Sequence, residues 1–141
     1  EGKKIPIHGY GAHIRSWIHV DDFCDAVDII ANGELNHNIY NIGGEEKSVT
    51  DILKAIAGYM KKDLASNRFH VDDRPGADMR YAVDASRFKN EFGYCSTKKN
   101  FDEEIKNIVK WYVDNSDWWK KVKEKNDFLE HYDRQSKGRW C

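Results

Sequence analysis

The chain of 141 residues lacks the features that mark several protein classes. Its 23 basic and 24 acidic side chains give no positive excess, which argues against a nucleic-acid-binding protein. No apolar run approaches the length of a membrane span, and the first residues lack the apolar core of a signal peptide. These absences favour a cytoplasmic protein that binds neither nucleic acid nor membrane.

Cysteine is also scarce. Cys24, Cys95 and Cys141 are an odd number with no CxxC spacing, so neither a disulfide framework nor a zinc site is indicated. The six histidines are scattered along the chain, and each is read as a surface or hydrogen-bonded residue. We therefore predict no metal site.

Catalytic motifs are missing as well. The chain contains no GxSxG, no metal-spaced histidine cluster and no Walker loop. The stretch "NIGGEE", residues 41–46, lacks the third glycine of a dinucleotide fingerprint. No residue is therefore assigned to catalysis or to cofactor binding from motifs.

The hydrophobic pattern predicts an α/β fold in a single domain. Apolar residues spaced by three and four predict helices, and two of these helices begin with a capping pair, Ser48 with Asp51 and Asn100 with Glu103. Asp21 or Asp22 is expected to cap an earlier helix that ends before Gly33. The expected strands are 3–9, 15–20, 38–44 and 68–71, and the expected helices are 21–32, 48–60, 84–92 and 100–112.

A change of composition after "NSDWWKK" separates a C-terminal arm from the rest of the chain. Residues 1–119 are predicted to form the main body, and residues 120–141 a charged and aromatic arm with one short helix. Trp118 and Trp119 could stack on a base or a sugar, but packing of a helix end is the better reading.

The stretch "DDRPGADMRY", Asp72 to Tyr81, contains one of only two prolines in the chain. Arg74 could form a surface ion pair with the two aspartates before it. Alternatively, Pro75 and Gly76 form a stiff turn that presents the Arg74 guanidinium to a phosphate. Arg15, which follows the flexible "GYGAH", raises the same question, because two such side chains can hold a diphosphate.

Several segments together resemble one family. "IPIHGYGAHIRSWIHVDDFCDAV", "NIYNIGG", "DDRPGADMRYAVDASRFKNEFGY" and "FDEEIKNIVKWYVDNSDWWKKV" are similar, in order and spacing, to the C-terminal part of nucleotide-diphosphate-glucose 4,6-dehydratases. These enzymes belong to the extended short-chain dehydrogenase/reductase superfamily. The resemblance implies the C-terminal substrate-binding portion of such a fold, without the Rossmann half that binds NAD.

The resemblance also implies an activity. Enzymes of this family are usually homodimers that use bound NAD to convert a nucleotide sugar into its 4-keto-6-deoxy form. By position, Arg15 and Arg74 match diphosphate-binding arginines, and Tyr132 matches a tyrosine that lies near the nucleotide. Ser48 falls about where the family often has an asparagine that contacts substrate.

Two positions depart from the family pattern. Ala77 stands where histidine is common, and Ser16 replaces the aspartate usual in bacterial dTDP-glucose enzymes. Arg-Ser is closer to some UDP-glucose dehydratases, whereas "RPGAD" and "HYDRQ" are closer to the dTDP type. The sequence favours dTDP-glucose over UDP-glucose only slightly.

The family's NAD loop, its Tyr-x-x-x-Lys pair and its acid–base residues lie upstream of Glu1 in the resemblance. We therefore expect the chain to be one part of a longer enzyme and to be inactive alone. A sugar-nucleotide epimerase or decarboxylase is one alternative, and a non-enzymatic binding or assembly module is another. The helix that begins at Phe23 is expected to pack on the missing half and to expose an apolar face without it.

Overall fold

Two small sheets form the centre of the molecule. The computed structural model describes residues 2–97 and 100–137. In one sheet, β1 (Ile5–His8) runs parallel to β4 (Arg68–Val71). In the other, β2 (Ile14–Trp17) lies between antiparallel β3 (Glu45–Ser48) and the short parallel strand β5 (Arg80–Tyr81).

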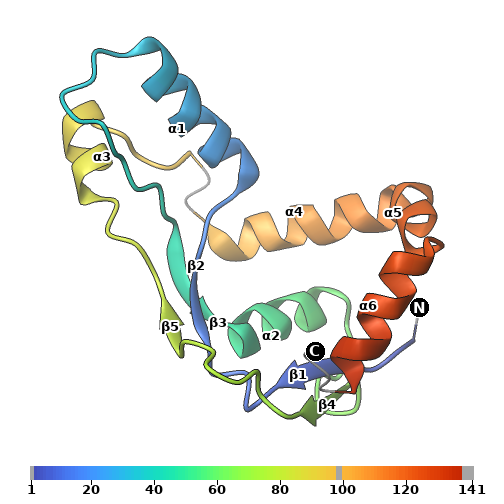
Figure 1. Cartoon of the computed structure of the whole chain (residues 1–141). Helices are drawn as coiled ribbons and strands as arrows, with labels where there is room; N and C mark the ends of the chain where they lie inside the picture. The colour runs from blue at the N-terminus through green and yellow to red at the C-terminus, as the bar shows by residue number, and fades with distance from the viewer. Residues whose placement is uncertain (1, 98–99, 138–141) are drawn as a thin grey trace.

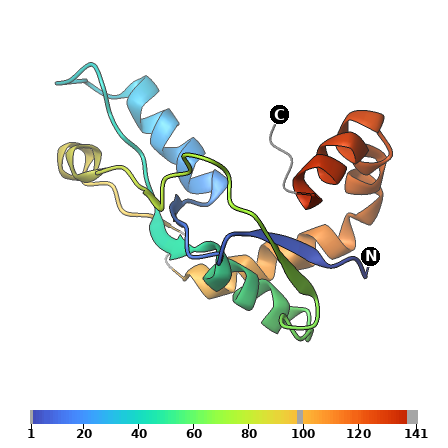
Figure 2. The same cartoon turned by 60° about the horizontal axis from the view of Figure 1, so that its bottom comes forward.

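Six helices surround these sheets in the part of the chain that the structure describes, which confirms the predicted α/β class. Figure 1 shows α2 beneath α4 on one side of β2 and β3, with α1 and α3 at the opposite end of the molecule. The chain then turns back through α5 and α6, and α6 ends beside β1 (Figures 1 and 2). The helices are α1 (Val20–Asn32), α2 (Val49–Tyr59), α3 (Ser86–Phe92), α4 (Phe101–Asp114), α5 (Ser116–Lys123) and α6 (Asn126–Ser136).

The best-marked helices begin where their capping pairs predicted. The Ser48 hydroxyl accepts a hydrogen bond from the Asp51 amide, and the Asp51 carboxylate accepts one from the Ser48 amide. The predicted capping box is therefore present. The Asn100 side chain likewise accepts the Glu103 amide at the start of α4. These caps are local in sequence, and the sequence pattern therefore predicted them correctly.

The start of α1 differs from its prediction. The helix begins at Val20, and the ring of His19 is the cap that accepts the Asp21 amide. Asp21 and Asp22 lie inside the first turn, where carboxylates stabilise the positive end of the helix dipole. The expected Asp cap is therefore wrong by two to three residues.

The strand predicted for residues 38–44 is wrong in this structure. No ladder includes these residues, and the neighbouring strand β3 begins only at Glu45. An extended apolar segment becomes a strand only when another strand offers hydrogen bonds, and none of the described residues does so for 38–44. Ile39 is 71% exposed, as expected for a segment without a sheet around it.

The C-terminal arm also contains more structure than predicted. Helix α5 spans residues on both sides of the expected boundary after residue 119, and α6 is the helix expected within the arm. Trp118 lies against Trp111 and Tyr112 of α4, which accords with the packing interpretation. The division of the chain at residue 119 stays a prediction.

The buried core is small. Ile7, Ala26, Ile52, Ala85 and Phe88 are its apolar members. Phe88 contacts Phe92 and Tyr94 at ring-centroid separations of 5.3 and 5.0 Å. The apolar face of α1 that includes Phe23 and Val27 is exposed, as predicted from the sequence.

Gly44 lies directly against the backbone of β2. A Cβ atom on Gly44 would be 1.7 Å from the carbonyl oxygen of Trp17 and 2.5 Å from its carbonyl carbon. Backbone cannot move aside as a flexible side chain can, so the two segments would have to separate. The second glycine of "NIGG" is therefore required by this close approach and not by a bound dinucleotide.

Replacement of Gly44 by alanine is expected to destabilise the fold by about 3 kcal/mol or more, through overpacking against fixed backbone. The control is Gly58→Ala, because nothing lies within 4 Å of a Cβ at Gly58 and alanine favours helix by about 1 kcal/mol. Denaturant unfolding would measure both variants. Equal stability of the two would contradict the close contact at Gly44.

The Glu91 carboxylate anchors the segment before residue 41 to α3. It accepts hydrogen bonds from the Tyr40 hydroxyl at 2.5 Å and from the Asn36 amide at 2.9 Å, and the His37 ring lies 2.9 Å from its other oxygen. These hydrogen bonds stabilise the ionised carboxylate, and the bond from the Tyr40 hydroxyl has the largest effect. Together they lower the pKa of Glu91 from 4.5 to about 2.

Because its pKa is lower in the folded protein, Glu91 contributes stability above pH 4.5 that is lost as the pH falls toward about 2. Glu91→Gln cannot titrate, so the stability difference between wild type and this variant is expected to shrink over that range. Thermal unfolding at a series of pH values would measure the difference. A difference that stays constant from pH 6 to pH 2.5 would contradict the anchoring role of the carboxylate.

Candidate functional site

The parallel pair β1 and β4 ends with two turns that lie side by side. After β1 the chain passes through Gly9 and Gly11, and after β4 it enters the segment that begins at Asp72. The Gly9 amide donates to the Val71 carbonyl at 3.0 Å, and the His70 Nδ1 lies 2.7 Å from the Gly9 carbonyl. Residues more than sixty positions apart in the sequence therefore form one edge of the molecule.

The Pro-Gly segment is a tight turn. The Ala77 amide donates to the Arg74 carbonyl at 3.1 Å, which closes four residues with Pro75 second and Gly76 third. Gly76 has a φ of 71°, in the left-handed region that the third position of a type II turn requires. The stiff corner predicted from Pro75 and Gly76 is thus confirmed as a backbone feature.

Asp73 ties this corner to the segment that leads into β2. One carboxylate oxygen lies 3.0 Å from the His13 Nε2, and the other accepts the Arg74 amide at 2.8 Å. A Cβ on Gly9 would be 2.9 Å from the Asp73 carboxylate, so the two turns are in close contact. Asp73 therefore positions the corner and does not serve only as a surface charge.

Arg15 lies on the central strand next to that corner. The Ile14 amide donates to the Met79 carbonyl at 2.8 Å, and the ladder then pairs Arg15 with Tyr81 of β5. The Arg15 side chain is half-buried and donates to the Ile14 carbonyl at 2.7 Å. The structure thus carries Arg15 and Arg74 on two segments that are hydrogen-bonded at Ile14–Met79 and in close contact at His13–Asp73.

A hollow of about 720 Å³ opens beside the two turns. Its walls come from the turn after β1, from β4 with the start of the corner, and from the end of α6. Ser136, the last residue of α6, and Lys137, which follows it, contribute the third wall. The lining residues are Gly9, Tyr10, Phe69, His70, Val71, Asp72, Asp73, Ser136 and Lys137.

Tyr132 lies on the helix that closes the hollow but does not line it. Its hydroxyl donates to the Lys4 carbonyl at 3.4 Å, and the Lys3 ammonium lies 5.6 Å from the centre of its ring. These contacts hold α6 against the chain before β1. In this structure Tyr132 therefore helps to position α6, whose last residue lines the hollow.

The structure places Ser48 on the other face of the β2–β3 ladder from Arg15. Ladder partners share a face of a sheet and neighbours alternate, so Ser48, the partner of Ile14, lies on the face opposite Arg15. Its hydroxyl donates to Asp51 at 2.7 Å within the capping box. This bond and the bond from the Ser48 amide lower the pKa of Asp51. The capping role accounts for Ser48 in this structure.

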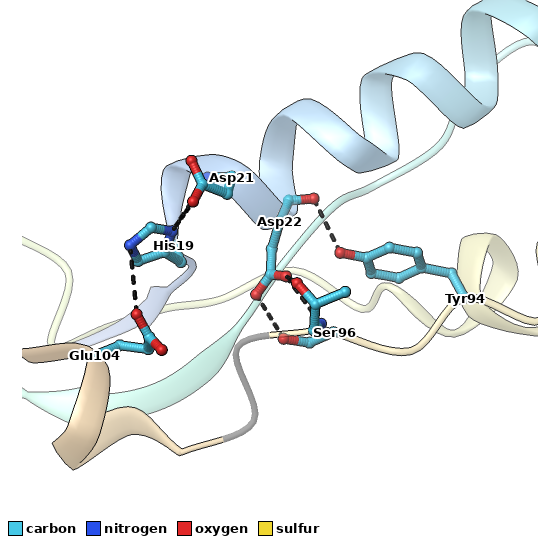
Figure 3. Close-up of polar contacts among 7 residues, drawn as sticks. His19, Asp21, Asp22, Tyr94, Ser96 and Glu104 are labelled. Carbon is cyan, nitrogen blue, oxygen red and sulfur yellow. Dashed lines mark hydrogen bonds and ion pairs between the residues drawn. The ribbon is translucent and has the colours of Figure 1, made fainter. Parts of the chain in front are cut away.

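A second cavity, of about 430 Å³, lies between β2 and the first half of α4. Asp22 borders it and is only 2% exposed, and its carboxylate accepts hydrogen bonds from Ser96 at 2.5 Å and from the Thr97 amide at 2.9 Å. Figure 3 shows these bonds with the separate His19–Glu104 pair, whose ring nitrogen and carboxylate are 3.8 Å apart. The bonds of Asp22 fasten the chain before α4 to α1, so these contacts give Asp22 a structural role.

Sequence reasoning missed two residues at the first hollow. Tyr10 is 91% exposed at its rim, between two glycines with φ values of 55° and 70°. His70 lies in its wall and is bonded to Gly9. The pattern Gly-Tyr-Gly in "HGYGAH" was the available signal, since a glycine on each side permits a tight turn that presents the ring.

Other kinds of site find little support in residues 2–97 and 100–137. No three His, Cys, Asp or Glu side chains there are grouped so that they could hold a metal ion. No helix in that part of the chain is both long and apolar enough to cross a membrane. The Gly43–Gly44 pair leads into strand β3 and not into a helix, so it does not form the phosphate loop of a dinucleotide site.

Comparison with known proteins gives a consistent result. Residues 1–43 match the NAD dependent epimerase/dehydratase family. Over 131 residues the chain is 35% identical to a probable dTDP-glucose 4,6-dehydratase of Sinorhizobium fredii, covering 87% of this chain and 37% of that protein. It is also 35% identical over 120 residues to a trifunctional UDP-glucose 4,6-dehydratase, 3,5-epimerase and reductase of Arabidopsis thaliana, covering 84% of this chain and 18% of that protein.

The fold agrees with these relatives. The crystal structure of a dTDP-glucose 4,6-dehydratase from Bacillus anthracis in complex with NAD matches with a TM-score of 0.75 and 36% identity. The match covers 86% of this chain and 38% of that one. The chain therefore spans little more than a third of the length of the dTDP-glucose relatives.

Ser48→Ala is expected to lower the free energy of unfolding by about 1 kcal/mol, because α2 loses its side-chain cap. Ser48→Thr keeps a hydroxyl at the same position and is expected to stay within about 0.5 kcal/mol of wild type. Denaturant unfolding of both variants would measure the difference. A stable alanine variant would remove the capping explanation for this residue.

Proposed function

Because the chain matches the C-terminal part of dTDP-glucose 4,6-dehydratases in sequence and in fold, we propose that it supplies the nucleotide-binding part of such an enzyme. Arg74 and Arg15 contact the diphosphate of the nucleotide sugar, and Tyr132 supports the nucleotide side through α6. The observation that carries this proposal is the approach of the Pro-Gly corner to the segment that leads into Arg15, with His13 3.0 Å from Asp73 and the Ile14 amide bonded to the Met79 carbonyl.

The physical argument rests on stiffness. A guanidinium forms two parallel hydrogen bonds with a phosphate, and little side-chain freedom is lost when its backbone is already fixed. Arg74 begins a closed type II turn, and Arg15 lies in the middle of a three-stranded sheet. A diphosphate bound between the two segments would receive positive charge from two directions.

In the proposed enzyme, hydride transfer takes place on NAD, to which no residue of this chain is assigned. When bound, NAD accepts a hydride from the sugar and returns it. The described residues of this chain contain no loop that fits NAD, so we assign none of them to cofactor binding. The role proposed for this chain is to hold and orient the nucleotide, and we expect it to be inactive alone.

The nucleotide is proposed to be dTDP-glucose, with UDP-glucose as the alternative. Relatives with both names occur among the matches. Only the resemblance supports a contact between Ser48 and substrate, because the Ser48 hydroxyl already bonds Asp51. Homodimer formation stays a prediction from the resemblance, and a cytoplasmic location stays a prediction from the composition. A non-enzymatic binding or assembly module stays the alternative.

Arg74→Ala is expected to weaken dTDP binding by about 1.5–3 kcal/mol, because a charged hydrogen-bonding partner of the diphosphate is lost. Calorimetric titration of the intact gene product would measure the affinity. Arg87→Ala is the matched control, because Arg87 belongs to α3, which lies far from β4 in Figure 1. Its guanidinium donates to the Ile39 carbonyl. Equal loss in both variants, or no loss in either, would refute the proposed role of Arg74.

A further inference from the structure

One buried histidine lies between the segment that leads into Arg15 and the Pro-Gly corner. His13 is only 6% exposed, and its Nε2 atom lies 3.0 Å from a carboxylate oxygen of Asp73. The contact does not have hydrogen-bond geometry, and no described residue hydrogen-bonds this nitrogen. A buried polar atom without a hydrogen bond is costly, so the position of this nitrogen beside Asp73 points to a role beyond packing.

The backbone that carries the ring is held by α2. The His13 carbonyl accepts a hydrogen bond from the Val49 amide at 3.1 Å, in the first turn of that helix. Two residues earlier, the Gly11 carbonyl accepts bonds from the Thr50 amide at 3.0 Å and from the Thr50 hydroxyl at 2.9 Å. The His13 ring therefore extends toward Asp73 from a fixed backbone.

The Asp73 carboxylate connects this ring to Arg74. One of its oxygens accepts the Arg74 amide at 2.8 Å, and the other faces His13 and would lie 2.9 Å from a Cβ atom on Gly9. A carboxylate oxygen can only accept hydrogen bonds, so the favourable form of the ring carries a proton on Nε2. His13 is thus the donor that can fix the rotation of this carboxylate.

From these contacts we propose that His13 is a positioning residue of the diphosphate site, which acts on Arg74 through Asp73. The inference rests on the function proposed above. Hydrogen bonds of this kind are often poorly aligned without ligand and tighten in the complex. When a diphosphate binds at Arg74, a small rotation of the ring aligns the Nε2–H group with the carboxylate, and the pair then holds the Arg74 amide in place.

Charge gives a second reason to fix this carboxylate. A diphosphate bound at Arg74 is negative, and like charges a few ångströms apart repel each other. An Asp73 side chain that lacks a donor at His13 can rotate toward the ligand and oppose its binding. With the donor present, the second carboxylate oxygen stays directed at His13 and the Gly9 turn.

The test is a double-mutant cycle on the intact gene product, with dTDP binding measured by calorimetry. His13→Leu keeps an apolar side chain of similar size without a donor and is expected to weaken dTDP binding roughly fivefold or more. In the Arg74→Ala background the same substitution is expected to change the affinity by less than about twofold, because the residue through which His13 acts is absent. His13→Gln offers an N–H group at a similar reach and is expected to bind dTDP within about twofold of wild type.

A histidine that only supports the fold would behave differently. Its loss would lower the free energy of unfolding and weaken dTDP binding alike in both backgrounds. Thermal unfolding of each variant identifies those that are folded at the temperature of the titration. His13→Met has a flexible apolar side chain that fits irregular space, and it replaces His13→Leu, with the same expected result, if the leucine variant does not fold.

The outcomes separate this inference from the proposed function. Weaker dTDP binding in Arg74→Ala, with normal binding in His13→Leu, would overturn the positioning role alone. An equal effect of His13→Leu in both backgrounds would also overturn it, as would a His13→Gln variant that binds as weakly as His13→Leu. Unchanged dTDP affinity in Arg74→Ala would overturn the proposed function, and this inference with it.

Discussion

The parallel pairing of β1 with β4 is the constraint on which the rest of the site depends. Its register sets His8 opposite Val71, so the two turns that follow the strands begin at the same level. The two turns and Arg74 lie within a few residues of that edge. Parallel strands need a long connection, and here the connection contains β2, α1, β3 and α2.

The connection from β1 to β4 also explains how Arg15 and Arg74 come to lie on neighbouring segments. The chain leaves β1, makes the Gly9–Gly11 turn and enters β2, which carries Arg15. It returns through β4, makes the Pro-Gly turn and enters β5, which lies beside β2. The Asp73 carboxylate lies 3.0 Å from the His13 ring, so one carboxylate is in contact with both paths. The site is thus built from backbone geometry, with few buried side chains.

Local features could be read from the sequence, and features that need a distant partner could not. The capping box at Ser48 and the type II turn at Pro75–Gly76 depend on a few neighbouring residues, and both were predicted. The strand expected at 38–44 was wrong, because its hydrogen-bonding partner would have to come from another segment. Helix α5 was missed because its tryptophans pack on α4, a contact that periodicity alone does not reveal. Tyr10 escaped notice for a similar reason, since exposure beside a hollow is a property of the folded chain.

The central claim is that a nucleotide diphosphate binds at the turns after β1 and β4. A ¹H–¹⁵N NMR titration of the labelled protein with dTDP would test it most directly, since Gly9, Gly11 and Gly76 report on those turns. The account predicts that these three amides shift together on saturation, while the amides of Gly43 and Gly44, which border the second cavity, stay in place. Shifts confined to Gly43 and Gly44, or no shifts at all, would contradict it.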